Sequence, residues 1–281
     1  MPTDAVPPSK TPEVLLRVRN LGKKYWTRRG AFRRRVPLAA ASNVSFEIPR
    51  GKTLAIVGSS GSGKSTVAKC VARLERPDSG EIWINEREIA QSDGTDLLLV
   101  RPEMQLVFQD PTTSMNARFS AVQTIEEPLL LQRRGSREER RTKVAELMKE
   151  VGLQPEWMDR RVTEFSGGQR QRIAIARALA LRPNLLILDE AFTGLDLSTQ
   201  AQIANLLIDL QAAHSLTYLL ISHDLTLVSR IADTIAVMSN GEIVEQGMSD
   251  EVLANPTRAE TRALVAAAQG LRSISAAQRS S

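Results

Sequence analysis

The sequence predicts an α/β fold with a mostly parallel sheet, an antiparallel β layer near the N-terminus and an inserted helical segment. The first observation is a set of four short apolar runs that lead directly into polar or glycine-rich sequence: "LAIVG", "MQLVF", "LLIL" and "YLLIS". Runs this short and uniformly apolar are typical of strands buried on both faces, as in a parallel sheet. The second observation is that helical patterns separate these runs, an alternation typical of an open, doubly wound sheet.

The chain before the first run predicts a tail and a small β layer. Residues 1–12 are rich in proline and polar side chains, which predicts a disordered tail. The stretches "EVLLRVRNL" and "ASNVSFEI" then predict antiparallel strands. We expect the ordered domain to span residues 13–265, followed by a C-terminal tail at 266–281 that ends in the polar "SISAAQRSS".

Helices are predicted at residues 65–74, 171–181 and 198–213, the last with apolar side chains three or four positions apart. Residues of about 112–164 are rich in Leu, Glu, Arg and Met at helical spacing. They predict a helical subdomain inserted into the core. No internal repeat is evident in the sequence, so we expect one domain of this kind.

Length and composition exclude several classes of protein. The chain has 281 residues, of which 42% are hydrophobic and 25% charged, ordinary values for a globular domain with a substantial core. No apolar run approaches the roughly 20 residues that cross a bilayer, and the start has no apolar segment of signal-peptide type, so we expect a cytosolic location. One cysteine, Cys70, excludes an internal disulfide and an all-cysteine metal site; we expect it to be buried in the first core helix.

The charge balance leaves anionic partners open. A net charge of +5 is mild for this length, and it permits contact with nucleic acid or with an anionic membrane surface. The densest basic run is "RRGAFRRRV" at residues 28–36. It predicts a solvated loop in the first place, with contact to lipid or RNA as the alternative.

A glycine-rich stretch between the first core strand and the first core helix has the pattern of a phosphate-binding loop. "GSSGSGKST" fits G-x-x-x-x-G-K-S/T, in the strand-loop-helix context that the pattern requires. Its glycines let backbone N–H groups turn toward phosphate oxygens, and the helix start adds its dipole. Lys64 would reach the β and γ phosphates, and the Ser65 hydroxyl would hold Mg²⁺. The predicted nucleotide-binding residues are Gly58, Ser59, Ser60, Gly61, Ser62, Gly63, Lys64, Ser65 and Thr66.

Polar side chains that follow the other predicted strands are expected at the same edge of the sheet. Asp189 is placed to bind Mg²⁺, and Glu190 to orient and deprotonate a water molecule. We interpret His223 and Gln109 as γ-phosphate sensors, with Gln109 also reaching Mg²⁺ or the attacking water. Taken singly, each would be an ordinary strand-end, core or loop residue. Their coexistence with the phosphate loop favours the catalytic interpretation.

Together these residues resemble the ATP-binding cassette (ABC) ATPases, over about residues 13–265. "FSGGQRQR" is similar to the signature motif of that family, and "TGLD" with Asp196 is similar to its D-loop. Tyr25 stands where the family places an aromatic side chain that stacks on adenine, with Trp26 as the second choice. The resemblance implies a P-loop core that hydrolyses ATP with Mg²⁺. The signature residues are Ser166, Gly167, Gly168 and Gln169.

In the ABC family two nucleotide domains associate head to tail, so the resemblance implies that each signature contacts the ATP held by the partner's phosphate loop. "VFQDPTTSMNAR" and "GEIVEQG" resemble segments of the ATPase subunits of oligopeptide, dipeptide and nickel importers. This likeness implies a second ATPase subunit, identical or related, two transmembrane permease subunits and, indirectly, an extracytoplasmic solute-binding protein. It also implies a peripheral position on the cytoplasmic face of the membrane, and it argues against a nucleic-acid partner.

Some residues depart from the importer pattern. Ala191 stands where the family usually has proline, which predicts a less rigid turn after Glu190, and Phe165 replaces the usual leucine of the signature. The chain lacks the His-Pro-Tyr that commonly precedes Thr-Arg-Ala-Leu in peptide importers, and it has no C-terminal cysteine cluster. The alanine at position 191 leaves the carboxylates intact, and the missing His-Pro-Tyr weakens the assignment of a peptide as the solute.

The leading hypothesis is therefore an ATPase that drives the import of a peptide or a similar small solute. One alternative is a soluble ABC ATPase that acts as an assembly or nucleic-acid-associated factor. Another is a catalytically inactive nucleotide-binding scaffold. The intact Lys64, Asp189, Glu190 and His223 oppose that last alternative.

Overall fold

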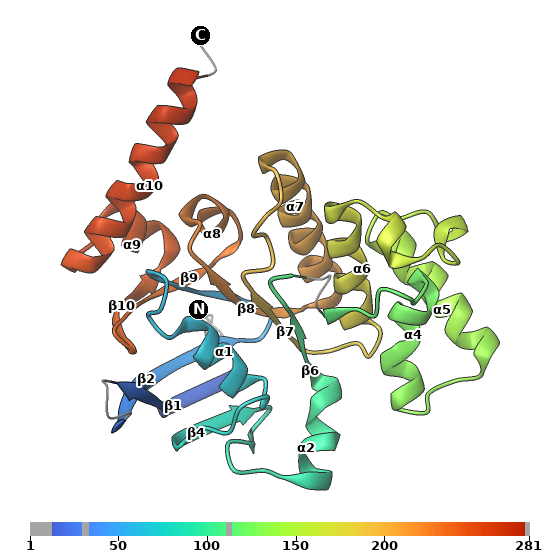
Figure 1. The fold of residues 1–281 in the computed structure, drawn as a ribbon, viewed down its shortest axis with the longest axis horizontal. Helices are drawn as coiled ribbons and strands as arrows, with labels where there is room; N and C mark the ends of the chain where they lie inside the picture. Colours follow the sequence, from blue (N-terminus) through green and yellow to red (C-terminus); the bar gives the residue numbers. More distant parts are fainter. Residues whose placement is uncertain (1–12, 30–33, 111–113, 279–281) are drawn as a thin grey trace, which may run out of the picture.

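The computed structural model describes residues 13–29, 34–110 and 114–278, which form two sheets with helices around them (Figure 1). In the central sheet the strand order is β10-β9-β3-β8-β7-β6, and every neighbouring pair is parallel except β9 and β10. The mostly parallel sheet predicted from the sequence is thus confirmed. Its strands are β3 (Thr53–Val57), β6 (Met104–Val107), β7 (Leu185–Asp189), β8 (Thr217–Ser222), β9 (Thr234–Ser239) and β10 (Glu242–Met248).

The central strands are apolar throughout because both of their faces are covered. In β7, Leu186 and Leu188 belong to one apolar cluster, whereas Leu185 and Ile187 belong to a second cluster on the opposite face. Successive side chains of a strand point to opposite faces of the sheet. Strands β3 and β8 alternate in the same way, and every residue of β3, β7 and β8 is buried.

The second sheet is antiparallel and has the order β2-β1-β4-β5. It confirms the predicted N-terminal β layer, although the first two strands are longer than the predicted stretches. Of the basic run predicted as a loop, residues 28–29 and 34–36 belong to β1 and β2, and residues 30–33 lie outside the described ranges. The strands are β1 (Val14–Arg29), β2 (Arg34–Pro49), β4 (Ser79–Ile84) and β5 (Arg87–Glu88).

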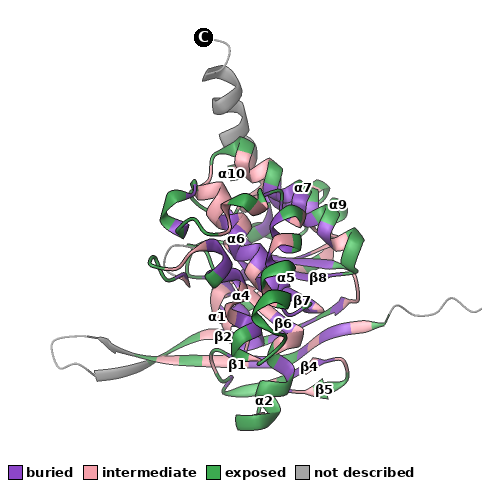
Figure 2. Ribbon diagram, turned by 90° about the vertical axis from the view of Figure 1, so that its right-hand side faces the viewer, coloured by how far each residue is buried: buried purple, intermediate pink, exposed green. Residues whose placement is uncertain are grey.

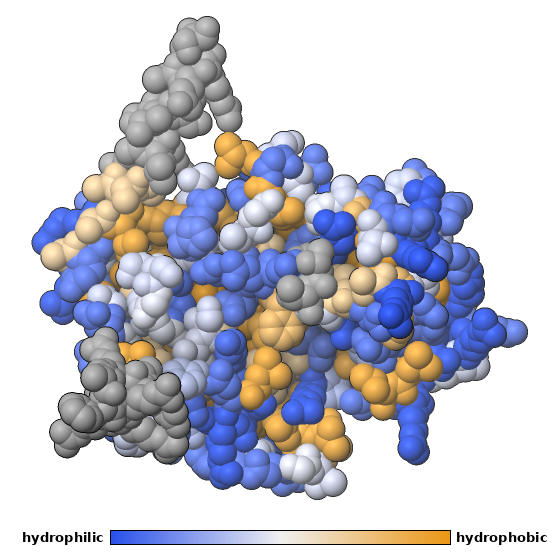
Figure 3. Space-filling view, viewed as in Figure 1, coloured by the Kyte–Doolittle hydropathy of each residue, from blue (hydrophilic) through white to orange (hydrophobic). Residues whose placement is uncertain are grey.

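Helices α1 (Lys64–Val71) and α2 (Gly94–Val100) pack with the antiparallel sheet on one face of the central sheet. Figure 2 shows the buried strands of the central sheet between these elements and the helices of the opposite face, and the face of the molecule in Figure 3 is largely hydrophilic, with smaller groups of apolar side chains. The other face is covered by α4 (Ala121–Leu131), α5 (Arg137–Glu150), α6 (Gly167–Leu179), α7 (Leu197–His214) and α8 (Leu225–Ile231).

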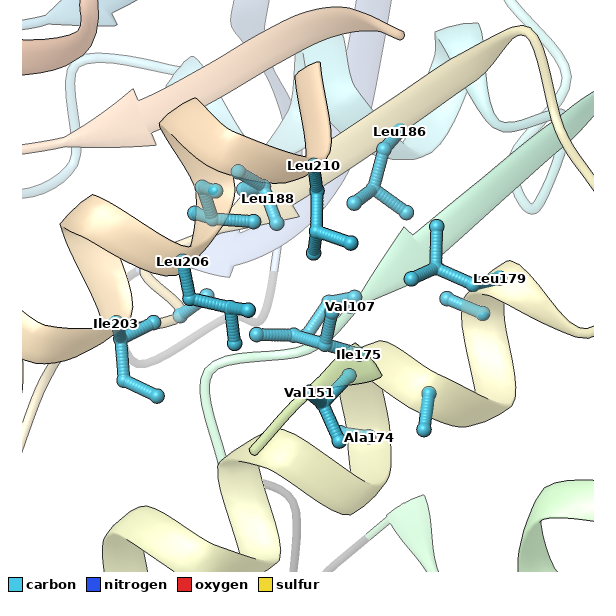
Figure 4. Packing of buried hydrophobic residues seen from close by; sticks show 14 of the residues in the cluster. Val107, Val151, Ala174, Ile175, Leu179, Leu186, Leu188, Ile203, Leu206 and Leu210 are labelled. Carbon is cyan, nitrogen blue, oxygen red and sulfur yellow. The ribbon is translucent and has the colours of Figure 1, made fainter. Parts of the chain in front are cut away.

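The helical face is held by aliphatic packing. Figure 4 shows Leu186 and Leu188 of β7 and Val107 of β6 facing Ile175 of α6 and Leu206 of α7. All five side chains are at most 9% exposed. Burial of this kind stabilises a fold by about 25 cal/mol for each Å² of apolar surface removed from water. The cluster therefore fixes α6 and α7 relative to the strand ends that carry the candidate catalytic residues.

The remaining short elements lie in the inserted segment and at the C-terminal end. The predicted insertion of about 112–164 is largely helical where it is described, with α4, α5 and the 3-10 turns Pro155–Trp157 and Val162–Glu164. Another 3-10 turn, Arg101–Glu103, lies outside the insertion and precedes β6. Helices α9 (Ser249–Ala254) and α10 (Ala259–Gln278) end the described chain. None of the helices in the described ranges is long and apolar enough to span a membrane.

The two predicted tails have different outcomes. Residues 1–12 lie outside the described ranges, so the disordered tail stays a prediction. At the other end, α10 crosses the predicted boundary at residue 265 and continues to Gln278, so part of the predicted C-terminal tail is helical, and the tail itself stays a prediction. The alanine-rich "ALVAAAQGL" favours a helix because alanine has the highest helix propensity. The domain limits of 13–265 remain a prediction.

Candidate functional site

The phosphate loop lies between β3 and α1 and leaves no room for side chains at two of its glycines. Gly58 has φ +154°, and a Cβ there would lie 2.2 Å from the carbonyl oxygen of Met238. Gly63 has φ +107° and caps the N-terminus of α1. A Cβ there would lie 1.9 Å from the carbonyl oxygen of Ala40. Residues of β2 and β9 therefore hold this loop from outside and require glycine at both positions.

Lys64 is buried inside the loop and donates to it. Its side-chain amine, Nζ, lies 3.0 Å from the Gly58 carbonyl oxygen and 2.8 Å from that of Ser59. Burial lowers the pKa of Lys64, and the nearby carboxylates of Glu190 and Asp189 oppose that shift. An ammonium group at the start of a helix is suited to bind a polyphosphate.

Ser62 contributes a second sign that the loop is built for a ligand. The residue is 4% exposed, and its hydroxyl has no hydrogen-bond partner among the described residues. A buried hydroxyl without a partner is costly unless a ligand or water satisfies it. The structure places it in the same loop as the Lys64 ammonium.

The Ser65 hydroxyl joins the phosphate loop to the end of β7. Ser65 Oγ donates to Asp189 Oδ1 over 2.8 Å, and Asp189 is 7% exposed. Burial raises the pKa of Asp189, and the hydrogen bond from Ser65 acts in the opposite direction. A hydroxyl and a carboxylate at this spacing are the oxygen donors that Mg²⁺ uses together with substrate phosphates. Ser65 and Asp189 therefore fit a magnesium ion that is also bound by nucleotide phosphates. Among the described residues there is no group of three or more His, Cys, Asp or Glu side chains that could hold a metal ion.

Glu190 and His223 lie beside this pair at the carboxyl ends of β7 and β8. His223 Nδ1 is 3.7 Å from Glu190 Oε1, with the histidine side chain exposed and the glutamate largely covered. The Glu190 N–H donates to the Ile221 carbonyl oxygen over 3.0 Å, which ties the turn to β8. Glu190 has φ +49°, a left-handed conformation that is uncommon outside glycine. The next residue, Ala191, is buried, so its place in the turn is fixed by packing.

Gln109 lies at the same edge but is more loosely attached. It is exposed two residues beyond β6, whose Val107 pairs with Leu188 of β7. No hydrogen bond joins it to Ser65, Asp189 or Glu190 within the described ranges. The predicted roles of Gln109 as a magnesium ligand and sensor thus stay predictions.

The signature stretch forms the start of α6, on the opposite face of the central sheet from α1. Ser166 caps the helix: its Oγ accepts from the Gln169 N–H over 3.3 Å, and Gln169 Oε1 accepts from the Ser166 N–H over 2.9 Å. This reciprocal capping box satisfies amide groups that a helix start leaves free. Gly167 and Gly168 follow in the half-buried first turn of α6, where the free amides of a helix start and the helix dipole favour an anion.

Asp196 caps the next helix, α7. Its Oδ1 accepts from the Thr199 N–H over 2.9 Å, and its Oδ2 accepts from the Thr199 hydroxyl over 2.7 Å. These hydrogen bonds hold the pKa of Asp196 below its ordinary value. A Cβ on Gly168 would lie 2.5 Å from Thr199 Cγ2. Thr199 therefore links the signature glycine to the D-loop aspartate.

The two aromatic candidates for base stacking lie on neighbouring positions of β1. Tyr25 is half-buried, and its hydroxyl donates to Glu75, which follows α1. Trp26 is 66% exposed. Since adjacent side chains of a strand point to opposite faces, Tyr25 is the aromatic that faces the phosphate-loop helix.

Comparison with known proteins agrees with this arrangement. The family model described as ABC transporter matches residues 41–193. The chain belongs to the ABC transporter ATP-binding family. It carries the ABC ATPase domain, and the family resemblance found in the sequence is confirmed.

Curated members of the ABC family cover most of the chain. It is 44% identical over 253 residues to the dipeptide transport ATP-binding protein DppF of Escherichia coli. The matched region covers 90% of this chain and 76% of that protein. It is 42% identical over 253 residues to DppF of Haemophilus influenzae, covering 90% of this chain and 77% of that protein.

Solved ABC structures share the fold. The structure of cbiO1 from Clostridium perfringens, part of the ABC transporter complex cbiONQ, has a TM-score of 0.75 and 29% identity, covering 86% of this chain and 92% of that one. A dimeric structure of the ATP-binding cassette MJ0796, in a post-hydrolysis state with ADP and Pi, has a TM-score of 0.73 and 29% identity, covering 84% of this chain and 99% of that one.

Sequence reasoning did not identify several residues around the ABC site. Ala40 and Met238 close over the phosphate loop from β2 and β9, and Glu75 holds Tyr25. These contacts join parts of the chain that are far apart, so no local pattern signals them. Thr199 could have been identified from the sequence, because a Thr three residues after Asp196 has the spacing of a helix cap.

Proposed function

We propose that the chain is the ATP-hydrolysing subunit of an importer for peptides or a similar small solute. The observation that carries this proposal is the Ser65–Asp189 hydrogen bond beside Glu190, at the mouth of a loop that encloses Lys64. The names of the relatives, dipeptide transport ATP-binding proteins, support the solute class.

The site residues have distinct roles in this proposal. The phosphates of ATP are bound by Lys64, Ser62 and the loop amides. The Tyr25 ring stacks on the adenine base. Ser65 and Asp189, with Gln109, hold Mg²⁺, which when bound withdraws charge from the phosphate oxygens. Glu190 accepts a proton from water as its oxygen attacks the γ-phosphorus. The bond to ADP then breaks, and ADP and phosphate are the products.

His223, at the carboxyl end of β8 and beside Glu190, contacts the γ-phosphate. Its 3.7 Å approach to Glu190 lets one side chain orient the other. The Ser166, Gly167, Gly168 and Gln169 stretch caps the ATP of a second ATPase subunit, and Asp196 lies at the same contact between subunits. Partner permeases in the membrane and, beyond them, a solute-binding protein complete the importer, with this chain on the cytoplasmic face.

Glu190→Gln provides the test of hydrolysis. The amide has nearly the same shape but accepts a proton poorly, so we expect ATP binding to persist while turnover falls by roughly 10²- to 10⁴-fold. Glu242→Gln makes the same chemical change on an exposed residue of β10 and should leave turnover unchanged. Phosphate release by the purified chain measures both. Turnover at the unaltered rate in Glu190→Gln would remove Glu190 from the role of base.

Capture from native membranes tests the importer part of the proposal. Glu190→Gln with ATP should retain two multi-span membrane subunits and a second ATPase subunit. Recovery with ribosomes or nucleic acid, without a membrane protein, would instead favour the soluble ABC ATPase of the alternative hypothesis.

A further inference from the structure

Tyr25 is held by a carboxylate that lies 50 positions away in the sequence. Its hydroxyl donates to Glu75 Oε2. Glu75 is only partly exposed, and the ammonium of Lys69, on α1, lies 3.9 Å from its other oxygen. The tyrosine side chain is thereby fixed at its tip as well as at its backbone, and the ring has one orientation.

The contact belongs to a wider attachment between β1 and the segment that follows α1. Lys23 Nζ donates to the Arg76 carbonyl oxygen over 2.7 Å, and the Lys24 N–H donates to Asp78 Oδ2 over 2.6 Å. The Asp78 N–H in turn donates to the Gly22 carbonyl oxygen over 2.8 Å. The strand that carries Tyr25 is therefore joined by several hydrogen bonds to the segment that follows α1.

Helix α1 connects this attachment to the phosphate loop. Its N-terminus begins at Lys64, in the phosphate loop, and its eight residues end at Val71, just before Glu75. A helix rises about 1.5 Å per residue, so α1 is a rigid spacer of about 12 Å. One end of the spacer lies in the phosphate loop. The segment that follows the other end carries Glu75, whose N–H donates to the carbonyl oxygen of Lys69 on α1 over 3.2 Å. The covalent structure of ATP likewise sets an upper limit on the distance between its phosphate groups and its base.

We propose that Glu75 is a positioning residue for base recognition, which holds the Tyr25 ring as a platform at a set distance from the phosphate loop. The proposal rests on the proposed function, because it assumes that this site binds ATP. It assigns no contact between Glu75 and the nucleotide. Glu75 acts through Tyr25, and Lys69 supports the carboxylate in its place.

The environment of Tyr25 agrees with this role. Burial raises the pKa of the Tyr25 phenol, and its bond to Glu75 raises it further, while Thr66 acts in the opposite direction. The phenol therefore stays protonated at neutral pH and can keep donating to the carboxylate. The ring itself is uncharged, which suits it to stack on a base, and the Lys23 ammonium lies 5.9 Å from the ring centre.

The test separates base recognition from phosphate binding. Calorimetric titration of the whole chain with ATP and with inorganic tripolyphosphate, both with Mg²⁺, measures the two affinities. We expect Glu75→Ala to weaken ATP binding by about 3- to 10-fold, the size typical of one lost hydrogen bond, and to leave tripolyphosphate binding within twofold. Tyr25→Phe removes the same bond from the other side. The double variant should therefore bind ATP no more weakly than either single variant.

Conservative and distant variants complete the experiment. Glu75→Gln keeps an acceptor oxygen and should bind ATP within about twofold of the unaltered chain, whereas Asp96→Asn removes an exposed charge on α2 and should change nothing. In steady-state hydrolysis Glu75→Ala should raise KM and leave kcat within twofold. Equal loss of ATP and tripolyphosphate affinity, or no loss of either, would overturn the role of Glu75. Failure of the unaltered chain to bind ATP would overturn the proposed function itself.

Discussion

Gly63 occupies a position at which the phosphate loop has no space for a side chain. A Cβ there would lie 1.9 Å from the Ala40 carbonyl oxygen and 2.8 Å from Met238 Cε, at φ +107°. Gly61, in the same loop, has φ +79°, but no atom lies within 4 Å of the place of its Cβ. Both positions favour glycine for conformational reasons, and only Gly63 is also required by packing.

This difference predicts unequal losses of stability. We expect Gly61→Ala to lower the free energy of unfolding by about 1–2 kcal/mol, the cost of a left-handed alanine. Gly63→Ala carries the same cost plus an overlap with backbone, so we expect a loss of at least about 3 kcal/mol. Urea denaturation followed by circular dichroism measures both values. Equal losses in the two variants would contradict the contact between β2 and the loop.

The same reasoning applies to the contact between two elements, α6 and α7. Gly168 in the first turn of α6 faces the methyl group of Thr199 in the first turn of α7, and a Cβ would lie 2.5 Å from it. We expect Gly168→Ala to lower the free energy of unfolding by about 1–3 kcal/mol, as overpacking does in other cores. Adding Thr199→Ser should recover most of this loss, because serine lacks the methyl group but keeps the hydroxyl that donates to Asp196.

A double-mutant cycle in urea is the measurement for this pair. Thr199→Ser alone should cost less than about 1 kcal/mol, since the cap of α7 is preserved. The coupling appears as a loss in the double variant that is smaller than the sum of the single losses. Strictly additive losses would show that Gly168 and Thr199 do not share the space between the helices.

Glu245 attaches the start of α10 to β10, and its titration makes that attachment dependent on pH. Burial raises the pKa of Glu245, but hydrogen bonds from the segment 257–261 outweigh it and lower the pKa to about 2. The carboxylate accepts from the Thr257 N–H over 2.8 Å and from the Arg258 N–H over 3.1 Å. A lowered pKa means that the stabilisation is complete above the ordinary value of 4.5 and is lost as the pH falls toward about 2.

We expect the amide exchange rates of the unaltered chain and of Glu245→Gln to differ near neutral pH and to become equal in acid. At pH 6, Glu245→Gln should exchange the amide hydrogens of residues 257 and 258 faster than the unaltered chain does. The ratio of the two rates should shrink steadily between pH 4.5 and pH 3. Hydrogen exchange read by mass spectrometry measures it, with Glu242→Gln on the same strand as the control. A ratio that is constant over this range would contradict the role of Glu245 as the acceptor.

The helices and strands that could be predicted from the sequence are those whose own residues show a clear local pattern. Strands β3, β6, β7 and β8 were predicted because burial on both faces leaves uniformly apolar runs. Helix α8 has only seven residues, too few to show a helical period. Helix α6 begins at Gly167 and not at residue 171, because the cap formed by Ser166 and Gln169 outweighs the low helix propensity of two glycines.

The candidate site divides in the same way. Residues in the phosphate loop and at strand ends belong to local motifs, so their neighbourhood could be predicted, and the Ser65–Asp189 bond agrees with it. Glu75 could not be predicted, because its bond to Tyr25 depends on how β1 packs against α1. The length of α10 was missed because the polar end of the sequence outweighed its alanine content in the prediction.

In the whole molecule the two glycine-rich loops lead into helices on opposite faces of the central sheet. Side chains of α1 belong to the apolar cluster on one face, and those of α6 belong to the cluster on the other. The phosphate loop and the signature stretch are therefore attached to different layers of the core. This arrangement supports our proposal that the signature serves the ATP of a second subunit in a head-to-tail pair.

Ser166→Arg tests that proposal, and the chain contains a matched control. Ser166 is exposed at the start of α6, and an arginine there would fill the space that a partner's nucleotide needs. Ser136 caps α5 with the same reciprocal pattern, in which Ser136 Oγ accepts from the Glu139 N–H and Glu139 accepts from the Ser136 N–H. Each substitution removes one helix cap, at a cost of about 1 kcal/mol in stability.

The two variants should differ only in assembly. In the Glu190→Gln background, which accumulates the ATP-bound state, Ser136→Arg should still form an ATP-dependent dimer in light scattering, whereas Ser166→Arg should stay monomeric. Both should still bind ATP, because Lys64 and the phosphate loop are unchanged. Ser166→Arg should bind it with the affinity of a monomer, without the gain in affinity that dimer formation brings to Ser136→Arg. With Glu190 intact, hydrolysis should be lost in Ser166→Arg alone. Loss of ATP binding by the Ser166→Arg monomer would mean that the signature serves its own subunit, and an unimpaired dimer would remove Ser166 from the contact between subunits.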